Sequence, residues 1–488
     1  MLPQDPQRPE EEDRVKRVLP WLVAVAFFMQ ALDTTILNTA VPTMAEALGV
    51  RPLDMKSVLS CYTLSVAVFV PVSGWIADRF GTRRVFATAI ALFMLGSLLA
   101  GLANSVQGLV FSRILQGFGG AMMVPVGRLT MVRTFPKSEL VRAMTFVSMP
   151  ALVGPMLGPV VGGLIVHYLH WRLIFLVNLP VGLAGLVLII RNMPDYRSDQ
   201  VWPLDWRGLL LFSSGLALLS YVLEVFGAHS LPGSTILLLL GVSVALIVGY
   251  AYHALGAEHP LLRLNLFRIR TFRTAAVGSF VTRLGASGVP FLLPLLYQSG
   301  LGYSPVQSAL LILPQFMTAL TVKALIPKIL ARLGYRGVLT TNTIAVGLLI
   351  ASFSTIHSGT AVPIILLQAS LFGFCQSLQF SSMNTLVYAD IRERDASMAS
   401  TMASTLQQMS MSFGVATASL LAAWLVPVNT GIASAELVAG IHKAFLVLGA
   451  LTVVSTLVFR GLRKDDGASV SLKGEVAEVR DKKLPPDT

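Results

Sequence analysis

Residues 74–84 read GWIADRFGTRR, a short charged stretch that lies between two long apolar runs. The runs at 57–77 and 85–103 are long enough to cross roughly 30 Å of hydrocarbon as helices, at about 1.5 Å per residue. In lipid the backbone must satisfy its own polar groups, so each run is interpreted as a helix. The charged stretch is therefore predicted to be a loop between two membrane-spanning helices.

The same alternation of apolar runs and charged loops extends along the whole chain. Hydrophobic residues make up 54% of the sequence and charged residues only 13%. We predict an all-α membrane protein with fourteen spans, at 18–41, 57–77, 85–103, 107–132, 141–166, 172–191, 207–226, 235–255, 273–298, 305–330, 338–356, 362–388, 397–425 and 441–462. The two cysteines, Cys61 and Cys375, fall inside apolar runs and are interpreted as small core hydrophobes. We expect no metal and no cofactor.

Positive charge is concentrated in alternate loops. The net charge of +12 could suggest a nucleic-acid partner, but the Lys and Arg residues sit in short connections between spans. By the positive-inside rule, the side of the membrane with more Lys and Arg in its loops is cytoplasmic. An even number of spans then places both termini on that side. Arg14, Lys16 and Arg17 lead into a first run that is too long for a cleaved signal peptide. We expect that run to stay as an anchor in a bacterial inner membrane.

The chain also repeats itself. The sequence RFGTR at 79–83 is matched by RLGYR at 332–336, and Pro52 is matched by Pro305 at the same shift. Duplicated six-helix halves are a common transporter design, with the substrate site between them near the bilayer midplane. The predicted parts are a cytoplasmic tail at 1–17, a six-helix bundle at 18–192, two additional helices at 206–257, a second six-helix bundle at 272–462 and a cytoplasmic tail at 463–488.

Five motifs in the first half identify a family resemblance. Besides residues 74–84 they are LDTTILNTAVP at 32–42, RILQGFGG at 113–120, GPMLGPVVGG at 154–163 and WRLIFLVNLP at 171–180. Together they resemble the motifs of the major facilitator superfamily, in its fourteen-span branch of drug:proton antiporters. The resemblance implies the major facilitator fold, with two six-helix bundles and two inserted helices. The second half matches mainly through the number of spans and the repeat.

The loop after the second span is expected to act as a conformational latch. The resemblance implies that it locks one access state, while Gly74 and Gly81 are expected to let the chain turn tightly. Asp78 and the arginines can hold helix ends through charge and the helix dipole. The predicted latch residues are Gly74, Asp78, Arg79, Gly81, Arg83 and Arg84. The second copy carries Ala331 in place of Asp78, so any latch there is expected to be weaker.

A stripe of glycines marks the fifth span. Gly154, Gly158 and Gly162 recur every four residues, so one helical face is bare and a neighbouring helix can approach closely. Prolines beside the stripe weaken the helical hydrogen-bond ladder. The helix-packing motif comprises Gly154, Pro155, Gly158, Pro159, Gly162 and Gly163. Close packing alone and an additional hinge function are both open interpretations.

Two opposite charges lie at similar membrane depth. A charge at the bilayer centre costs at least about 3 kcal/mol on insertion scales, so it should be paired or line a wet cavity. Asp33 in the first span and Arg113 in the fourth both lie roughly 9–12 Å below the outer surface by helical rise, so they could meet. We predict that Asp33 binds the driving proton and that Arg113 tunes it. The alternative is a structural ion pair.

Other polar residues at membrane depth are candidates for the substrate cavity. They are Gln30, Thr34, Asn38, Gln116, Arg283, Lys323, Gln376 and Gln379. The glutamines could instead bond neighbouring helices, as could Gln407 and Gln408. Arg128 and Lys323 lie where a long side chain can reach the interface, and Glu224 is interpreted as an interfacial acid.

The sequence favours a proton-coupled exporter of amphipathic compounds or drugs that works as a monomer by alternating access. Spans nine to thirteen carry no acid at membrane depth and offer Arg283 and Lys323 instead. An exporter of an anionic metabolite, metal chelate or lipid-like acid is therefore the alternative. A membrane sensor without transport is disfavoured by the intact motifs. An enzyme is disfavoured because no catalytic cluster and no phosphate-binding loop occur in the sequence.

Overall fold

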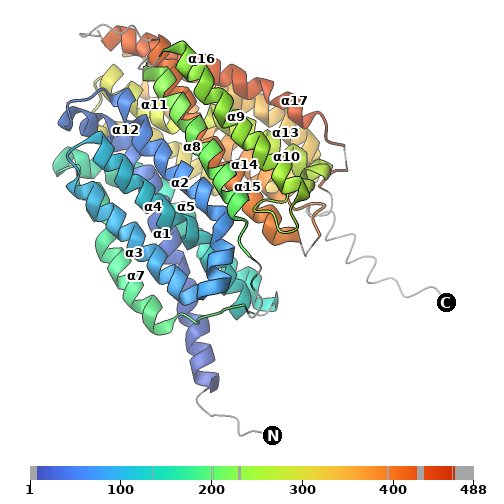
Figure 1. The fold of residues 1–488 in the computed structure, drawn as a ribbon. Helices are drawn as coiled ribbons and strands as arrows, with labels where there is room; N and C mark the ends of the chain where they lie inside the picture. Colours follow the sequence, from blue (N-terminus) through green and yellow to red (C-terminus); the bar gives the residue numbers. More distant parts are fainter. Residues whose placement is uncertain are drawn as a thin grey trace, which may run out of the picture. The chain divides into compact units, whose positions relative to one another are not determined.

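The computed structural model describes residues 8–135, 137–198, 201, 203–228, 232–392, 395–425, 434–463 and 465–467. Every regular element within these ranges is helical, and a helix lies at each of the fourteen predicted spans (Figure 1). Twelve of the helices are long and apolar enough to cross a membrane. The remaining two predicted spans coincide with α5 and α15, which contain 32 and 30 residues. The all-α membrane fold is thereby confirmed.

The chain divides into two compact units, at 1–206 and 207–488. The helices of the first unit are α1 (Arg8–Ala47), η1 (Pro52–Met55), α2 (Lys56–Phe80), α3 (Thr82–Leu102), α4 (Val106–Thr134), α5 (Lys137–Tyr168), α6 (Leu173–Leu176) and α7 (Asn178–Asn192), followed by the start of α8 at Trp206. Its core is formed by apolar side chains of α1, α2, α3, α4, α5 and α7, among them Phe27, Phe86 and Phe93.

The second unit holds the remaining helices. They are α8 (Trp206–Ala228), α9 (Gly233–Gly256), η2 (Leu264–Arg268), α10 (Arg270–Ala286), α11 (Val289–Leu295), η3 (Leu296–Gly300), α12 (Pro305–Thr321), η4 (Val322–Ala324), α13 (Ile326–Ser352), η5 (Phe353–Thr355), α14 (Val362–Leu386), α15 (Ala396–Leu425), α16 (Ser434–Val454) and α17 (Thr456–Phe459). α8 and α9 meet through a hydrogen bond from Ser243 Oγ to the Gly215 carbonyl at 2.9 Å. Leu237 and Leu238 of α9 are 70% and 66% exposed, as expected for side chains that face lipid.

The two units use the same pattern of helix pairs. In the first, α1 packs against α5 and α7, α2 against α4, and α3 against α4 and α7. In the second, α10 packs against α15 and α16, α12 against α14, and α13 against α14 and α16. The pattern is the one that a duplicated six-helix bundle produces, with α10 in the place of α1.

The repeated loop motif has the same backbone geometry in both units. Gly81 has φ +94° and ψ 143°, and it ends α2 and begins α3. Gly334 has φ +68° and ψ 163° and interrupts α13. Only glycine adopts such angles without strain, so each motif forms a sharp corner at its central glycine. Gly74 does not turn the chain: it lies within α2, and the expectation of a tight turn there is wrong.

Two boundaries differ from the prediction. α1 begins at Arg8 rather than at 18, so part of the predicted tail is helical. The predicted span at 305–330 is not one continuous α-helix, because the 3₁₀ turn at Val322–Ala324 separates α12 from α13. Residues 1–7 and 468–488 of the predicted tails lie outside the described residues.

Candidate functional site

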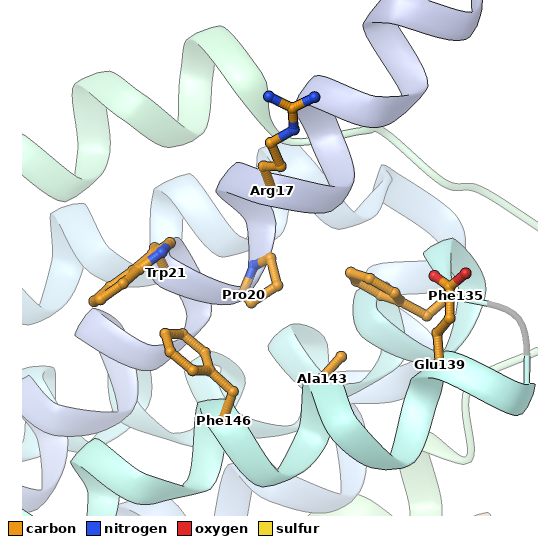
Figure 2. A pocket seen from close by; sticks show the side chains of 7 residues that line it. All are labelled: Arg17, Pro20, Trp21, Phe135, Glu139, Ala143 and Phe146. Carbon is orange, nitrogen blue, oxygen red and sulfur yellow. The ribbon is translucent and has the colours of Figure 1, made fainter.

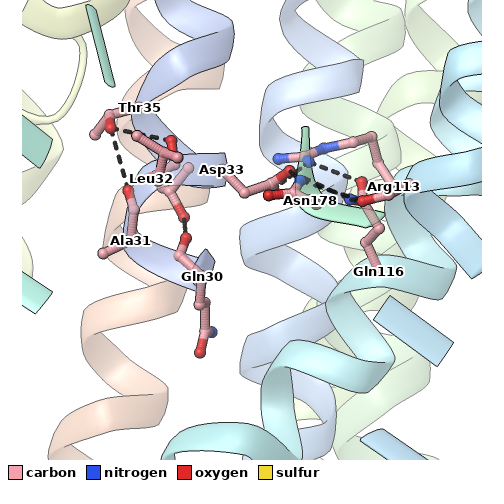
Figure 3. A network of polar contacts seen from close by, with 10 residues as sticks. Gln30, Ala31, Leu32, Asp33, Thr35, Arg113, Gln116 and Asn178 are labelled. Atoms are coloured by element: carbon pink, nitrogen blue, oxygen red, sulfur yellow. Dashed lines mark hydrogen bonds and ion pairs between the residues drawn. The ribbon is translucent and has the colours of Figure 1, made fainter. Parts of the chain in front are cut away.

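A buried ion pair links α1 to α4 in the first unit. The Arg113 guanidinium donates through Nη1 to Asp33 Oδ2 at 2.5 Å, and both side chains are almost completely inaccessible to solvent. The two charges that the sequence placed at one depth therefore meet, as Figure 3 shows. A buried pair of this kind offsets the cost of removing two charges from water only if further hydrogen bonds complete it.

Those further bonds come from α3, α4 and α7. Gln116 Nε2 donates to Asp33 Oδ1 at 3.2 Å, and Asn178 Nδ2 donates to the same oxygen at 2.9 Å. Gln116 and Asn178 also donate to Ser97 Oγ, at 2.6 and 3.2 Å. The Asp33 carboxylate thus accepts hydrogen bonds from one guanidinium and two side-chain amides. All five residues belong to one buried network.

The Arg113 side chain is fixed by two further contacts. Nη1 also donates to Gln116 Oε1 at 2.8 Å, and the guanidinium carbon lies 4.4 Å from the centre of the Tyr62 ring on α2. A ring face stabilises a cation, and more so where water is excluded. Arg113 Nε has no hydrogen-bond partner among the described residues. The network is therefore not saturated.

The predicted cavity residues of α1 lie beside this network. Gln30 Nε2 donates to the Gly120 carbonyl of α4 at 3.2 Å, and Thr34 Oγ1 bonds back to the Gln30 carbonyl at 2.8 Å. Thr34 and Asn38 are half-buried. Gln116 differs from the prediction, because its side chain is fully buried in the ion-pair network rather than facing a cavity.

The glycine stripe of α5 packs directly on the part of α1 that carries Asp33. A Cβ added to Gly154 would lie 2.9 Å from Ala31 Cβ, and one added to Gly158 would lie 2.8 Å from Thr35 Cβ. A Cβ on Gly162 would lie 2.5 Å from the Ile36 carbonyl oxygen. Real Cβ atoms do not approach so closely, so the stripe sets the separation of the two helices. Pro155 is half-buried, whereas Pro159 and Gly163 are buried.

In the latch loop, Asp78 pairs with an arginine of α4. Asp78 Oδ1 accepts a hydrogen bond from Arg133 Nη2 at 2.8 Å, and both side chains are partly exposed. The loop arginines are not its ion-pair partners: Arg79 lies over the Trp75 ring at 5.8 Å, and the side chains of Arg83 and Arg84 are exposed. The sequence did not predict the pairing of Asp78 with Arg133, near the end of α4.

The second unit contains a buried cation of a different kind. Arg283 of α10 is 5% exposed, donates from Nε to Ser279 Oγ at 3.0 Å, and lies 3.8 Å from the centre of the Phe380 ring on α14. No carboxylate of the described residues forms an ion pair with it. Lys323 lies in η4 and is half-buried.

The glutamines of α14 divide between two environments. Gln376 is half-buried, and its Oε1 accepts from Gln315 Nε2 of α12 at 3.2 Å. Gln379 is fully buried: it accepts from Asn342 Nδ2 at 2.9 Å and donates to Thr343 Oγ1 at 2.5 Å. Gln379 therefore bonds a neighbouring helix, the alternative that the sequence left open, and does not face a cavity. Gln407 and Gln408 are half-buried and Arg128 is exposed.

Two members of the network around Asp33, Ser97 and Asn178, were not predicted. Ser97 sits in an apolar run without a charged neighbour, and nothing in the sequence distinguishes it. Asn178 is part of the motif at 171–180, and its polarity within an apolar stretch was an available signal. The side chain of Glu224 lies outside the described side chains.

A surface pocket of about 450 Å³ lies beside the N-terminal part of α1. Figure 2 shows Arg17, Pro20 and Trp21 of α1 on one side and Ala143 and Phe146 of α5 on the other, with Phe135 and Glu139 nearby. None of the predicted cavity residues lines it.

Comparison with known proteins gives consistent matches along the chain. The sequence model of the Major Facilitator Superfamily matches residues 23–415. The protein named multidrug resistance protein MdtD of Shigella boydii is 43% identical over 404 residues, which cover 82% of this chain and 85% of that protein. Its namesake in Klebsiella pneumoniae is 40% identical over 456 residues, covering 93% and 96%. The crystal structure of a POT family transporter in complex with 5-aminolevulinic acid aligns with a TM-score of 0.68 at 17% identity, covering 91% of this chain and 95% of that chain. At that identity the structural likeness concerns the fold alone.

The close packing of α5 on α1 gives a direct test. Gly158→Ala should lower the melting temperature of the purified protein, because overpacking costs about 1–3 kcal/mol. Gly185→Ala is the matched control, since an added Cβ in α7 meets nothing within 4 Å and alanine favours a helix over glycine. Thermal unfolding of both variants in the same detergent measures the difference. Equal melting temperatures would contradict a contact of this tightness.

Proposed function

The chain belongs to the major facilitator superfamily, and from this premise we propose that it is a proton-coupled antiporter that exports amphipathic compounds, drugs among them. The observation that carries the proposal is the buried Asp33–Arg113 pair, in which an acid at membrane depth is held by three donors from two other helices, α4 and α7. The relatives named for multidrug resistance support the cargo class.

Asp33 is the proposed proton site. When the carboxylate gains a proton, its attraction to Arg113 is lost and the guanidinium keeps only Gln116 and the Tyr62 ring as close partners. A buried cation without its counter-ion is unfavourable, so the protonated state favours a different arrangement of α1 and α4. The glycine stripe of α5 has no side chains, so α1 can slide along it. Proton binding is thereby linked to the change of access state.

Asp78 and Arg133 form the proposed latch. The pair joins the cytoplasmic ends of α2 and α4, where both side chains are partly exposed. A pair at such a surface contributes at most about 1 kcal/mol. That is too little to decide whether the protein folds, yet enough to shift an equilibrium between two access states about fivefold.

We propose that the protein lies in a bacterial inner membrane with both termini in the cytoplasm, and the distribution of Lys and Arg supports this orientation. Its partners are protons, the lipid bilayer and one small-molecule cargo at a time, and the monomer is the working unit. The two bundles contain all the residues to which a role is assigned, and α8 and α9 are additional helices.

An anionic cargo is the second candidate, and Arg283 favours it. Its guanidinium is buried against Phe380 with no described carboxylate as counter-ion. A carboxylate or sulfonate on an apolar cargo would supply the missing charge, while the ring could contact the apolar part.

Asp33→Asn should abolish transport that is driven by a pH gradient. Proteoliposomes with an imposed gradient are tested with ethidium and with 8-anilinonaphthalene-1-sulfonate, and their accumulation is followed by fluorescence. Because the substitution leaves Arg113 without its counter-ion, it should also destabilise the fold by about 3–5 kcal/mol. Asp33→Asn with Arg113→Gln removes both charges and should restore folding but not coupling. Gradient-driven accumulation by the folded double variant at the wild-type rate would place proton coupling elsewhere.

Asp78→Asn should slow turnover about fivefold without changing the concentration of cargo at half-maximal rate. Reversing the pair, with Asp78→Arg and Arg133→Asp together, should recover more turnover than either single change. The rates are measured per folded transporter in the same proteoliposomes. Unchanged turnover in Asp78→Asn would contradict the proposed latch role of Asp78.

Arg283→Gln separates the two cargo candidates. If the cargo is anionic, transport of 8-anilinonaphthalene-1-sulfonate should fall about tenfold or more while any transport of ethidium persists. Arg283→Lys keeps the charge but loses the planar group that stacks on Phe380, so it should recover only part of the activity. Equal effects on both dyes would exclude Arg283 as an anion-selective group.

A further inference from the structure

The segment that follows α7 runs along the latch loop and is bonded to it. We define residues 193–198 as the exit strap. The Thr82 amide donates to the Tyr196 carbonyl at 3.0 Å, and the Tyr196 amide donates to Thr82 Oγ1 at 3.0 Å. The Ser198 amide donates to the Asp78 carbonyl at 3.1 Å. Both sides of the corner at Gly81 are therefore attached to one segment.

Asp195 fills the inside of that corner. Its Oδ1 accepts from the Arg83 amide at 3.1 Å, in the first turn of α3. A Cβ added to Gly81 would lie 2.8 Å from Asp195 Cγ and 2.9 Å from Oδ2, so the carboxylate occupies the space that the glycine leaves. A carboxylate at a helix N-terminus is also favoured by the helix dipole. Gly81 is thus required both for its positive φ and for the approach of Asp195.

The exit strap also reaches the other half of the latch. The Tyr196 hydroxyl lies 3.1 Å from Thr134 Oγ1, the last residue of α4, and Thr134 follows Arg133 in sequence. The Asp78 side chain bonds Arg133 while the Asp78 carbonyl bonds Ser198. One segment therefore bonds the backbone of Asp78 and the side chain of the residue that follows Arg133.

The second bundle has an equivalent segment after its last helix. Asp466 forms an ion pair with Arg270 at the start of α10, and a Cβ added to Gly467 would lie 2.8 Å from Tyr335 Cε2. Tyr335 directly follows the corner glycine Gly334. The contacts differ in chemistry, yet in each bundle the segment after the final helix contacts the residue that follows the corner glycine.

We propose that the exit strap is part of the latch, and that Asp195 is the positioning residue that holds the Gly81 corner and thereby presents Asp78 to Arg133. This inference rests on the latch role proposed above for Asp78. Asp195 lies outside the spans and contacts no residue of the Asp33 network, so it should act on the rate of the access change and not on cargo binding.

Amide hydrogen exchange of the full-length protein in nanodiscs tests the positioning without any cargo. Asp195→Ala should accelerate exchange of the peptide that contains Thr82 and Arg83 by about tenfold, because it removes the acceptor of a capping bond. Asp195→Asn keeps a side-chain oxygen and should remain close to the wild type. Glu258→Ala, at an exposed acid of the loop after α9, is the control. Unchanged exchange in Asp195→Ala would overturn the proposal.

Turnover then separates positioning from general stability. Asp195→Ala should lower turnover per folded transporter, with the half-saturating cargo concentration unchanged, and Asp195→Asn should recover it. A loss of folded protein with normal turnover per molecule would reduce Asp195 to a structural residue and overturn the proposal. If turnover is normal in Asp195→Ala but slow in Asp78→Asn, the proposal for the exit strap fails and the latch role of Asp78 stands. If Asp78→Asn is normal too, the latch itself fails.

A double-substitution cycle shows whether Asp195 acts through the corner. Gly81→Ala should be harmful because of its positive φ and because of the contact with Asp195, and only the second cause disappears in Asp195→Ala. The turnover loss of the double variant should therefore be smaller than the product of the two single losses. Multiplicative losses would mean that the residues act independently, against the proposal.

Discussion

The low dielectric of the membrane interior is the constraint on which the first unit depends. It is the reason why Asp33 and Arg113 form an ion pair. An uncompensated charge at membrane depth is expensive, so each of the two residues requires the other. Completing the pair draws Gln116 from α4, Asn178 from α7 and Ser97 from α3 to the same point. Apolar packing brings helices together without choosing their rotation, whereas these directional bonds require particular faces of four helices to meet. The polar network thus orients the bundle.

The glycine stripe follows from the same requirement. α1 can bring Asp33 to Arg113 only if α5, which packs along its other side, leaves room for the α1 backbone at Ala31 and Thr35. Side chains there would push α1 away, and fixed interdigitation would also resist sliding. A bare surface allows close approach without interlocking. Close packing and a hinge function are therefore compatible interpretations of the glycine stripe. The sequence left both open, and the structure does not require a choice between them.

The sequence predicted what depends on depth and periodicity. Helical rise placed Asp33 and Arg113 at one level, and the repeat of RFGTR and RLGYR anticipated the matching corners at Gly81 and Gly334. It could not predict what depends on helix rotation. Asn178 reaches Asp33, and Ser97 reaches Gln116 and Asn178, because of the direction in which α7 and α3 face. The burial of Gln116 and Gln379 in polar networks depends on helix rotation in the same way. The pairing of Arg133 was overlooked because the positive-inside rule already accounts for an arginine at the end of a span.

The two bundles share a pattern of helix pairs but differ in their polar interiors. The first closes an acid and a base into one network, which leaves a proton as the simplest means of changing it. The second has glutamines that bond one another or neighbouring helices, together with the Arg283 guanidinium, which lies against an aromatic ring and is paired with no described acid. A cargo with an acceptor group or a negative charge could bind at that guanidinium. Duplication followed by this chemical divergence would allow one bundle to respond to the gradient and the other to recognise the cargo, so that neither site has to meet both demands.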